Sequence, residues 1–316
     1  MHRAARTLLA AGAVLLVLHA SALAEEGGAG HYTPGATASF MDALPGKPGL
    51  ALADFFVFYT ASTGGRLPIA GLISVTLDVT VFADSLVGIY QTQLALLGGS
   101  YAFGGVLPVL WMDLTGTVVA GSGTRNASDS SSGIGDVLLY PLMLGWTAAG
   151  GDLKYDVRLG IYAPTGKFEE GALANVGKNY WTFEPTVTVS FISSKIGLET
   201  SAYAAVDFNT KNKTTDYQTG TQFHVDATVA EHVPLFAGFF GVGANAFYYQ
   251  QIAGDSGSGA TLGDFKGHTV GVGPVASYAM KLDGVQGAVE LKWLPELDTK
   301  NRIKGDYFWI KIGAVF

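Results

Sequence analysis

Ionisable side chains recur at alternate positions of several apolar segments of this 316-residue sequence. At that spacing, carboxylate, imidazole, ammonium and guanidinium groups can pair with one another or act on a polar solute. They are Asp78, Asp156, Arg158, Glu199, Asp207, His224, Asp226, Glu290, Lys292 and Lys311. The aromatic residues Tyr203 and Trp309 occupy alternate positions of the same kind. Such a set either fills a protein interior with salt bridges or lines a pathway and tunes what passes.

Three short motifs imitate catalytic or cofactor-binding sequences. Gly254–Gly257 matches the surroundings of a serine-protease nucleophile, but it lies in a Gly/Ser-rich stretch without a fitting triad. Pro164–Lys167 lacks the full spacing of a phosphate-binding loop, and no helix follows Gly238, Gly241 and Gly243 as a dinucleotide site requires. The sequence therefore predicts no catalytic residue, no cofactor and no enzyme.

The histidines beyond residue 24 are His31, His224, His232 and His268, and none has the i,i+4 helical spacing of a metal site. His224 and Asp226 share one face of an extended segment, where they can hydrogen-bond in a polar interior. The sequence predicts no metal site.

The composition is unusual for a soluble enzyme, because apolar residues make up 48% of the chain and charged residues only 14%. Beyond residue 24, no apolar run reaches the roughly 20 residues that a membrane helix needs. The net charge of −7 argues against nucleic acid as a partner, and without cysteine the fold closes without disulfides. Apolar residues interleaved with Thr, Ser, Gly and aromatics are typical of a transmembrane β-barrel.

Alternation with a period of two residues is the strongest structural signal. In Tyr307–Phe316, Phe308 and Ile310 alternate with Trp309 and Lys311, and residues 75–82, 155–161, 186–191, 223–229 and 285–293 alternate similarly. Because successive strand side chains point to opposite faces, one face meets lipid and the other a polar lumen. An Arg or Lys facing lipid at mid-depth costs roughly 2–4 kcal/mol, so we predict that the ionisable set faces inward.

The segments predict an all-β, antiparallel up-and-down transmembrane barrel of about 12 strands over residues 50–316, with 10 to 14 strands possible. The N-terminal third is predicted as strands Leu50–Tyr59, Leu72–Ala83 and Ser100–Ala120, with Asp84–Leu97 as a short helix or long turn. Short periplasmic turns are predicted at Ala148–Gly151, Ser193–Lys195, Glu231–Pro234 and Lys281–Gly284. External loops are predicted at Ala61–Gly71, Gly121–Ser132, Pro164–Lys178, Asn209–Thr219, Ile252–Asp264 and Pro295–Lys304.

The N-terminus has the pattern of a signal peptide over residues 1–24. Arg3 and Arg6 precede the apolar run Leu8–Leu18, and Ala22–Ala24 supplies a small-x-small cleavage pattern. The chain is therefore predicted to be exported and cleaved after Ala24. Residues 25–49 are Gly/Pro-rich without periodicity, so they form either a disordered lead-in or an ordered plug in the lumen.

Several segments resemble the outer-membrane family named for the meta-pathway of phenol degradation, a SphA-like or transporter family. The resemblance runs from about residue 27 to the end, and each motif is weak alone but specific as a set. The motifs are Gly28–Gly35, Gly135–Pro141 with Leu144–Trp146, Tyr162–Gly166 with Asn175–Trp181, Phe223–Asp226 and Gly305–Lys311. The resemblance implies an outer-membrane protein associated with aromatic or hydrophobic catabolism, and it carries no catalytic residues.

The predicted function is an outer-membrane channel or transporter for passive uptake of small hydrophobic or aromatic compounds in a Gram-negative bacterium. Tyr203, Phe247, Tyr249, Tyr307 and Trp309 would give the lumen an aromatic lining. The predicted partners are the solute, outer-membrane lipid and lipopolysaccharide, and the barrel assembly machinery through the terminal Phe316. The alternatives are a lipid-modifying enzyme, which would need an exposed Ser–His pair, and a structural or adhesive barrel without an open path.

Overall fold

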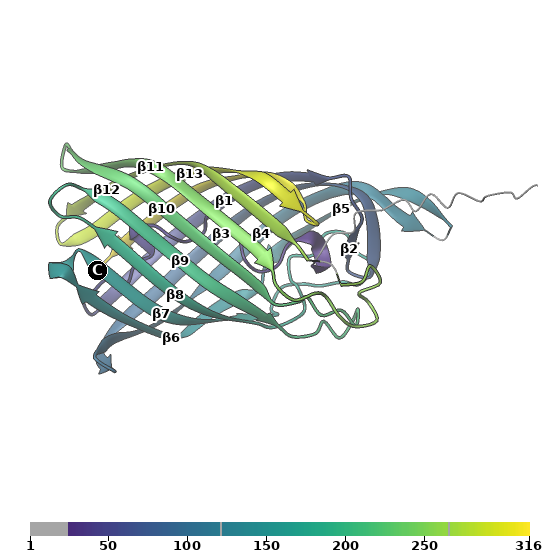
Figure 1. Ribbon diagram of the computed structural model, residues 1–316, viewed down its shortest axis with the longest axis horizontal. Helices are drawn as coiled ribbons and strands as arrows, with labels where there is room; N and C mark the ends of the chain where they lie inside the picture. Colours follow the sequence, from purple (N-terminus) through teal and green to yellow (C-terminus); the bar gives the residue numbers. More distant parts are fainter. Residues whose placement is uncertain (1–24, 121, 265) are drawn as a thin grey trace, which may run out of the picture.

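The computed structural model describes residues 25–120, 122–264 and 266–316, so the predicted signal peptide lies outside the described residues. Twelve antiparallel strands close into one barrel, with β1 hydrogen-bonded to both β3 and β14 (Figure 1). They are β1 (Gly49–Thr63), β3 (Leu72–Leu96), β4 (Gly99–Ala120), β6 (Val137–Ala148), β7 (Leu153–Ala163), β8 (Thr182–Ile192), β9 (Leu198–Asn209), β10 (Gln222–Leu235), β11 (Gly238–Gln251), β12 (His268–Leu282), β13 (Val285–Lys300) and β14 (Lys304–Val315). The predicted fold class is confirmed.

Two further strands lie outside this circle. β2 (Leu67–Ile69) pairs with the start of β3, and β5 (Gly123–Ile134) pairs with Val109–Ala120 of β4. The other half of β4 pairs with β6 from Ser100 to Val106, so the wall forks near Pro108. In Figure 1 the β4–β5 ribbon projects beyond the loops at the right of the barrel. We call the end with the long loops external and the end with short turns and the C-terminus periplasmic.

Two predicted connections in the N-terminal part are wrong. Asp84–Leu97, expected as a helix or turn, falls almost entirely within β3, which pairs on both sides with β1 and β4. Gly121–Ser132, expected as a loop, is mostly β5. Neither segment shows an apolar alternation, because β5 is built almost entirely of small and polar residues and Asp84 interrupts the apolar face of β3. Backbone pairing with β4 holds both extended regardless of their side chains.

Two boundaries in the C-terminal half also differ from the prediction. Glu231–Pro234 belongs to β10, and the turn follows at residues 236–237. Most of Pro295–Lys304 belongs to β13 and β14, which are joined by residues 301–303. Polar strand ends outside the lipid look like loops in the sequence, because their outward face needs no apolar residues there.

The wall of the barrel is apolar outside, and on strands such as β13 its inner face is polar. On β13, Leu291 and Trp293 are 49% and 46% exposed, whereas Glu290 and Lys292 are buried. Five outward aromatic residues occupy hydrogen-bonded neighbouring positions on five strands: Trp293, Phe308, Phe58, Phe82 and Trp111. Two residues further toward the external end, the outward row becomes Pro295, Asp306, Thr60, Thr80 and Asp113. The outer surface thus changes from apolar to polar across this row, as at the edge of a lipid layer.

Beyond that row, β2, β5 and the external parts of β3 and β4 form an extension with the opposite polarity. Leu77, Val79, Leu114 and Val118 point inward into an apolar core with β2. The outward residues between them include Thr76, Asp78 and Thr80, which are exposed. The extension is therefore built like a soluble β-sheet, with water on its outer face.

Residues 25–48 lie inside the barrel and run from its external end to the start of β1. Two short 3₁₀ turns, η1 (Glu26–Gly28) and η2 (Phe40–Asp42), interrupt an otherwise irregular path. Near the external end Lys178 donates to the carbonyl of Ala29, and near the periplasmic end the amide of Gly46 donates to Gln91. We call this segment the plug.

Within the described residues, no helix has the length and apolar character needed to cross a membrane.

Candidate functional site

Of the twelve residues predicted to line the lumen, the structure buries all except Asp78. The buried ones are Asp156, Arg158, Glu199, Tyr203, Asp207, His224, Asp226, Glu290, Lys292, Trp309 and Lys311. Asp78 is exposed on the outer face of the extension, between the buried Leu77 and Val79. The prediction was wrong there because it assumed that every outward face meets lipid.

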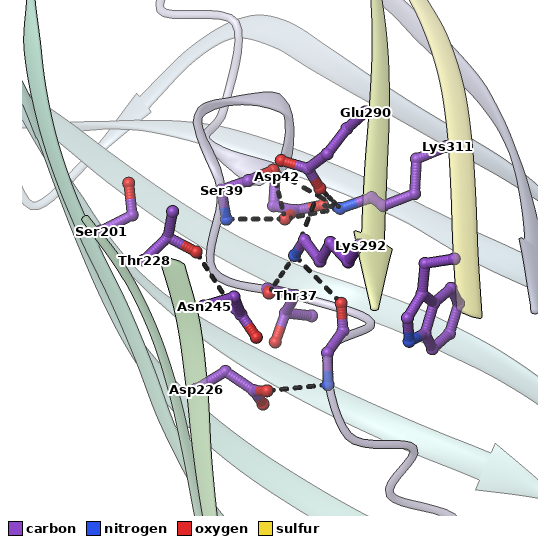
Figure 2. Close-up of polar contacts among 12 residues, drawn as sticks. Thr37, Ser39, Asp42, Ser201, Asp226, Thr228, Asn245, Glu290, Lys292 and Lys311 are labelled. Carbon is purple, nitrogen blue, oxygen red and sulfur yellow. Dashed lines mark hydrogen bonds and ion pairs between the residues drawn. The ribbon is translucent and has the colours of Figure 1, made fainter. Parts of the chain in front are cut away.

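The predicted ionisable residues hold the plug. Figure 2 shows Lys311 of β14 donating to both carboxylate oxygens of Asp42, at 2.7 and 2.8 Å. Glu290 of β13 lies 3.4 Å from the same ammonium group. On the other side of the plug, Arg158 of β7 donates to the carbonyl of Asp42 at 2.6 Å and pairs with Asp156. Asp42 is thus held between opposite parts of the wall.

A second group of contacts fixes the plug around Gly35, which precedes Asp42 in the chain. Its amide donates to Asp226 at 2.8 Å, and its carbonyl accepts from Lys292 at 3.1 Å (Figure 2). Lys292 also donates to the carbonyl of Thr37 at 3.2 Å, and Trp309 donates to that of Pro34 at 3.0 Å. These side chains replace the secondary structure that the plug lacks, since buried backbone groups need hydrogen-bond partners.

Glu199 of β9 makes a similar contact nearer the periplasmic end. It accepts from the backbone amide of Phe40 at 2.7 Å and from the imidazole of His232 at 2.7 Å. The ring of Phe40 lies edge-on to that of His232, with centroids 5.2 Å apart. The plug is therefore attached to β7, β9, β10, β13 and β14.

Two carboxylates and a histidine meet beside Tyr32 of the plug. Nε2 of His224 lies 3.5 Å from Glu184 and 3.4 Å from Asp207, and these donor atoms all fall within 4.8 Å of one another. The donor types suit a divalent cation, and the same spacing suits an imidazolium held between two carboxylates. Tyr32 stacks on His224 with centroids 3.8 Å apart and donates to Asp226 at 3.0 Å. The predicted pairing of His224 with Asp226 is thus replaced by these contacts.

The external end of the plug meets the long loop 164–181. Asp136, between β5 and β6, accepts from the imidazole of His31 at 3.0 Å and from the backbone amides of Gly166 and Lys178. Burial lowers the pKa of His31, although Asp136 beside it acts in the opposite direction. One carboxylate thus joins the plug, the barrel wall and an external loop.

A cavity of about 660 Å³ separates the plug from the wall of β1, β3 and β4. On this wall the cavity is lined by inward side chains that are small or apolar: Ala51, Ala53, Phe55, Val57, Ala83, Ser85, Val87, Ile89, Val106, Pro108 and Leu110. The plug contributes Tyr32, Ala36, Phe40 and Met41. The lining reaches from Val176 in the external loop to Gly238 at the periplasmic end of β11. The polar contacts thus hold the plug against one side of the barrel. The cavity on the other side has an apolar face on β1, β3 and β4, and charged residues such as Asp42, Arg158 and Glu184 line it opposite that face.

Two groups of carboxyl residues in this site were not predicted from the sequence. Glu184 and Glu296 are buried and face inward, and extending the alternation of β8 and β13 by a few residues would have found them. Asp42 and Glu25 of the plug have no such signal, because irregular segments carry no periodicity. In the motif Gly254–Gly257, Asp255 accepts hydrogen bonds from Tyr217 and from the amide of Gly220.

Fold and site define a plugged, closed β-barrel whose polarity is that of an outer-membrane barrel protein. The chain belongs to the family described as "Putative MetA-pathway of phenol degradation", whose profile matches residues 61–312. The resemblance seen in the sequence is thereby confirmed.

Among solved structures, the chain is similar to the COG4313 outer membrane channel from Pseudomonas putida F1. The identity is 15% and the TM-score 0.61, with 90% of this chain and 100% of the channel covered. At that identity the likeness shows the fold. The β-domain of the Bordetella autotransporter BrkA aligns over 85% of this chain and 99% of its own, at 14% identity and a TM-score of 0.42. A comparison with curated protein sequences gives no match.

Proposed function

We propose that this protein is an outer-membrane channel for passive uptake of small hydrophobic or aromatic compounds. In this proposal residues 1–24 direct its export and are then removed. The observation that carries the proposal is the cavity between the plug and β1, β3 and β4. Its side chains on those strands offer no charge to a solute, and the charged residues that line it, such as Arg158 and Asp42, lie on the opposite side and bind one another. An apolar solute can follow this passage without displacing a salt bridge.

The apolar outer face of the wall supports an outer-membrane location with lipid and lipopolysaccharide as surroundings. Phe316 ends the chain directly after β14, where its side chain is 60% exposed. We propose it as the contact for the barrel assembly machinery. The name of the family motivates the link with aromatic catabolism, and the aromatic nature of the solute remains part of this proposal.

Narrowing the cavity along its apolar face on β1, β3 and β4 tests the proposal. Ala53 lines the cavity from β1, so Ala53→Trp should obstruct it. In proteoliposomes with a lipopolysaccharide outer leaflet, we expect uptake of labelled toluene to fall about tenfold, which requires only about 1.4 kcal/mol of added barrier. Ala244→Trp is the matched control, because Ala244 is exposed on the lipid face of β11. Equal toluene uptake by both variants, or a wild type that passes glucose as fast as toluene, would contradict the proposal.

Loosening the plug distinguishes a barrel that conducts solute from one whose lumen is only filled with side chains. Lys311→Met leaves Asp42 buried without its ammonium partner, and breaking such a pair costs about 3–5 kcal/mol. We expect higher single-channel conductance in planar bilayers, with heat-modifiable gel migration retained. Lys300→Met, at the exposed external end of β13, is the control. Conductance that stays at the wild-type level would favour the structural or adhesive alternative.

A further inference from the structure

Glu25 occupies an unusual place for a residue at the edge of a cleavable leader. It is fully buried at the external end of the lumen, between loop 252–267 and Arg302 in the β13–β14 turn. Its backbone has φ 69° and ψ 141°. A residue with a Cβ avoids this region of backbone space, and holding it there costs on the order of 1–3 kcal/mol. The φ torsion exists only while a residue precedes Glu25.

The backbone nitrogen of Glu25 points at a buried carboxylate. It donates to Oδ2 of Asp255 at 3.1 Å, and Asp255 also accepts from Tyr217, the amide of Gly220 and Gln251. Asp255 is 9% exposed. The carboxyl group of Glu25 meets Tyr249 and Arg302. The first residue after the predicted cleavage point is thus already placed against an acidic partner.

The surrounding charges are short of one cation. Three carboxyl groups, from Glu25, Glu26 and Asp255, share this pocket with Arg302 and Lys178. Oε2 of Glu25 and Oε1 of Glu26 are buried and have no hydrogen-bond partner in the described part of the chain. Burial raises the pKa of the Glu25 carboxyl to about 7, against the opposing effect of Arg302.

Further carboxyl groups lie around the two cations and add to the negative charge. Glu296 of β13 acts on Arg302, and Asp136 acts on Lys178. A positive group at the nitrogen of Glu25 would face Asp255, Glu25 and Glu26 directly, with Arg302 and Lys178 opposing it. It would also bring additional N–H donors to a pocket with unpartnered oxygens.

We propose that the α-ammonium group created on Glu25 by leader removal binds Asp255 as a buried ion pair and anchors the external end of the plug. The inference rests on the proposed export. A signal-peptide endopeptidase hydrolyses the Ala24–Glu25 bond: water supplies the hydroxyl of the new Ala24 carboxyl group and a hydrogen to the Glu25 nitrogen, which binds a further proton at neutral pH. Cleavage removes the unfavourable φ torsion and supplies the missing cation together.

The test uses the mature protein purified from outer membranes. N-terminal sequencing should find Glu25 first. The α-amine is then labelled with isotopic cyanate over a range of pH, and the N-terminal peptide is quantified by mass spectrometry. An α-amino group ordinarily has a pKa of about 7.7–8.0. Pairing with Asp255 should raise the midpoint by about one unit and slow labelling about tenfold below it, relative to the urea-unfolded chain.

Two variants sharpen the result. Asp255→Asn should return the midpoint toward the ordinary value, whereas Asp298→Asn should not, because Asp298 is 77% exposed at the end of β13. If Asp255→Asn does not fold, the wild-type midpoint alone decides. A buried amine without an anionic partner would titrate below its ordinary pKa, and that result overturns the proposal. A first residue other than Glu25 also overturns it. Neither readout involves solute uptake, so failure here is distinguishable from failure of the channel proposal.

Discussion

The barrel wall and the external extension of β3–β5 use the same alternation with opposite polarity. On β13 the outward Leu291 is 49% exposed and Lys292 is buried, whereas on β3 the outward Asp78 is exposed and Leu77 is 1% exposed. The two patterns meet on β3 itself between Thr80 and Phe82. Alternation therefore reports which residues share a face, while the medium outside each face decides which set turns outward. A single strand crosses from lipid into water without any change in its backbone.

The difference predicts that truncating a leucine matters more in the extension, where Leu77 faces inward, than in the wall, where Leu291 faces lipid. Leu77→Ala should leave a cavity in an apolar core and lower the free energy of unfolding by about 2–5 kcal/mol. In the wall, Leu291→Ala removes only lipid contacts, so its effect should be much smaller. Urea unfolding in detergent micelles, followed by tryptophan fluorescence, measures both. Equal losses would mean that the extension has no core of its own.

A charge on the outward face should have the reverse effect. Leu291→Arg places a guanidinium against lipid two residues inside the aromatic row and should cost roughly 1–3 kcal/mol, whereas Thr80→Arg, two residues beyond the lipid edge on β3, should be close to neutral. Unfolding in phospholipid vesicles is the appropriate measurement, because the penalty requires a hydrocarbon layer. A neutral Leu291→Arg would remove the basis for the lipid-facing assignment.

The smallest expected effect concerns two carboxyl groups that break the pattern of the wall. Asp54 of β1 shares the outward parity of Leu52 and Phe58, and Asp84 of β3 is its diagonal neighbour across the β1–β3 pairing. Replacing both with Asn should stabilise the barrel in vesicles by about 1 kcal/mol, less than the Arg and Lys penalties. Asp78→Asn in the extension should change nothing. Destabilisation by the double variant would point to a specific role for this pair.

Much of the fold could be predicted from the residues. The alternation in 285–293 and 307–316 placed Glu290, Lys292, Trp309 and Lys311 inside, and all four are buried there. The twelve-strand closure also followed, because the alternating segments and the turn-like stretches between them divide residues 50–316 into an even number of strands. The errors at Asp78 and Asp84–Leu97 have different causes. β3 has 25 residues, more than the 9–11 needed to span, and Asp78 lies in the part outside the lipid, whereas Asp84 interrupts the apolar outward face within the wall.

The sequence by itself determined the class of fold and which residues of each wall strand share a face, since both depend on local side-chain periodicity. Only the tertiary structure decided what the interior charges do. Lys311 hydrogen-bonds to Asp42, which is 269 residues away in the chain, and Asp226 accepts from Gly35, which is 191 residues away. An irregular plug has no period to read, and its path depends on many such long-range contacts forming together. The cavity beside β1, β3 and β4 depends on the same contacts, because they hold the plug against the other side of the barrel.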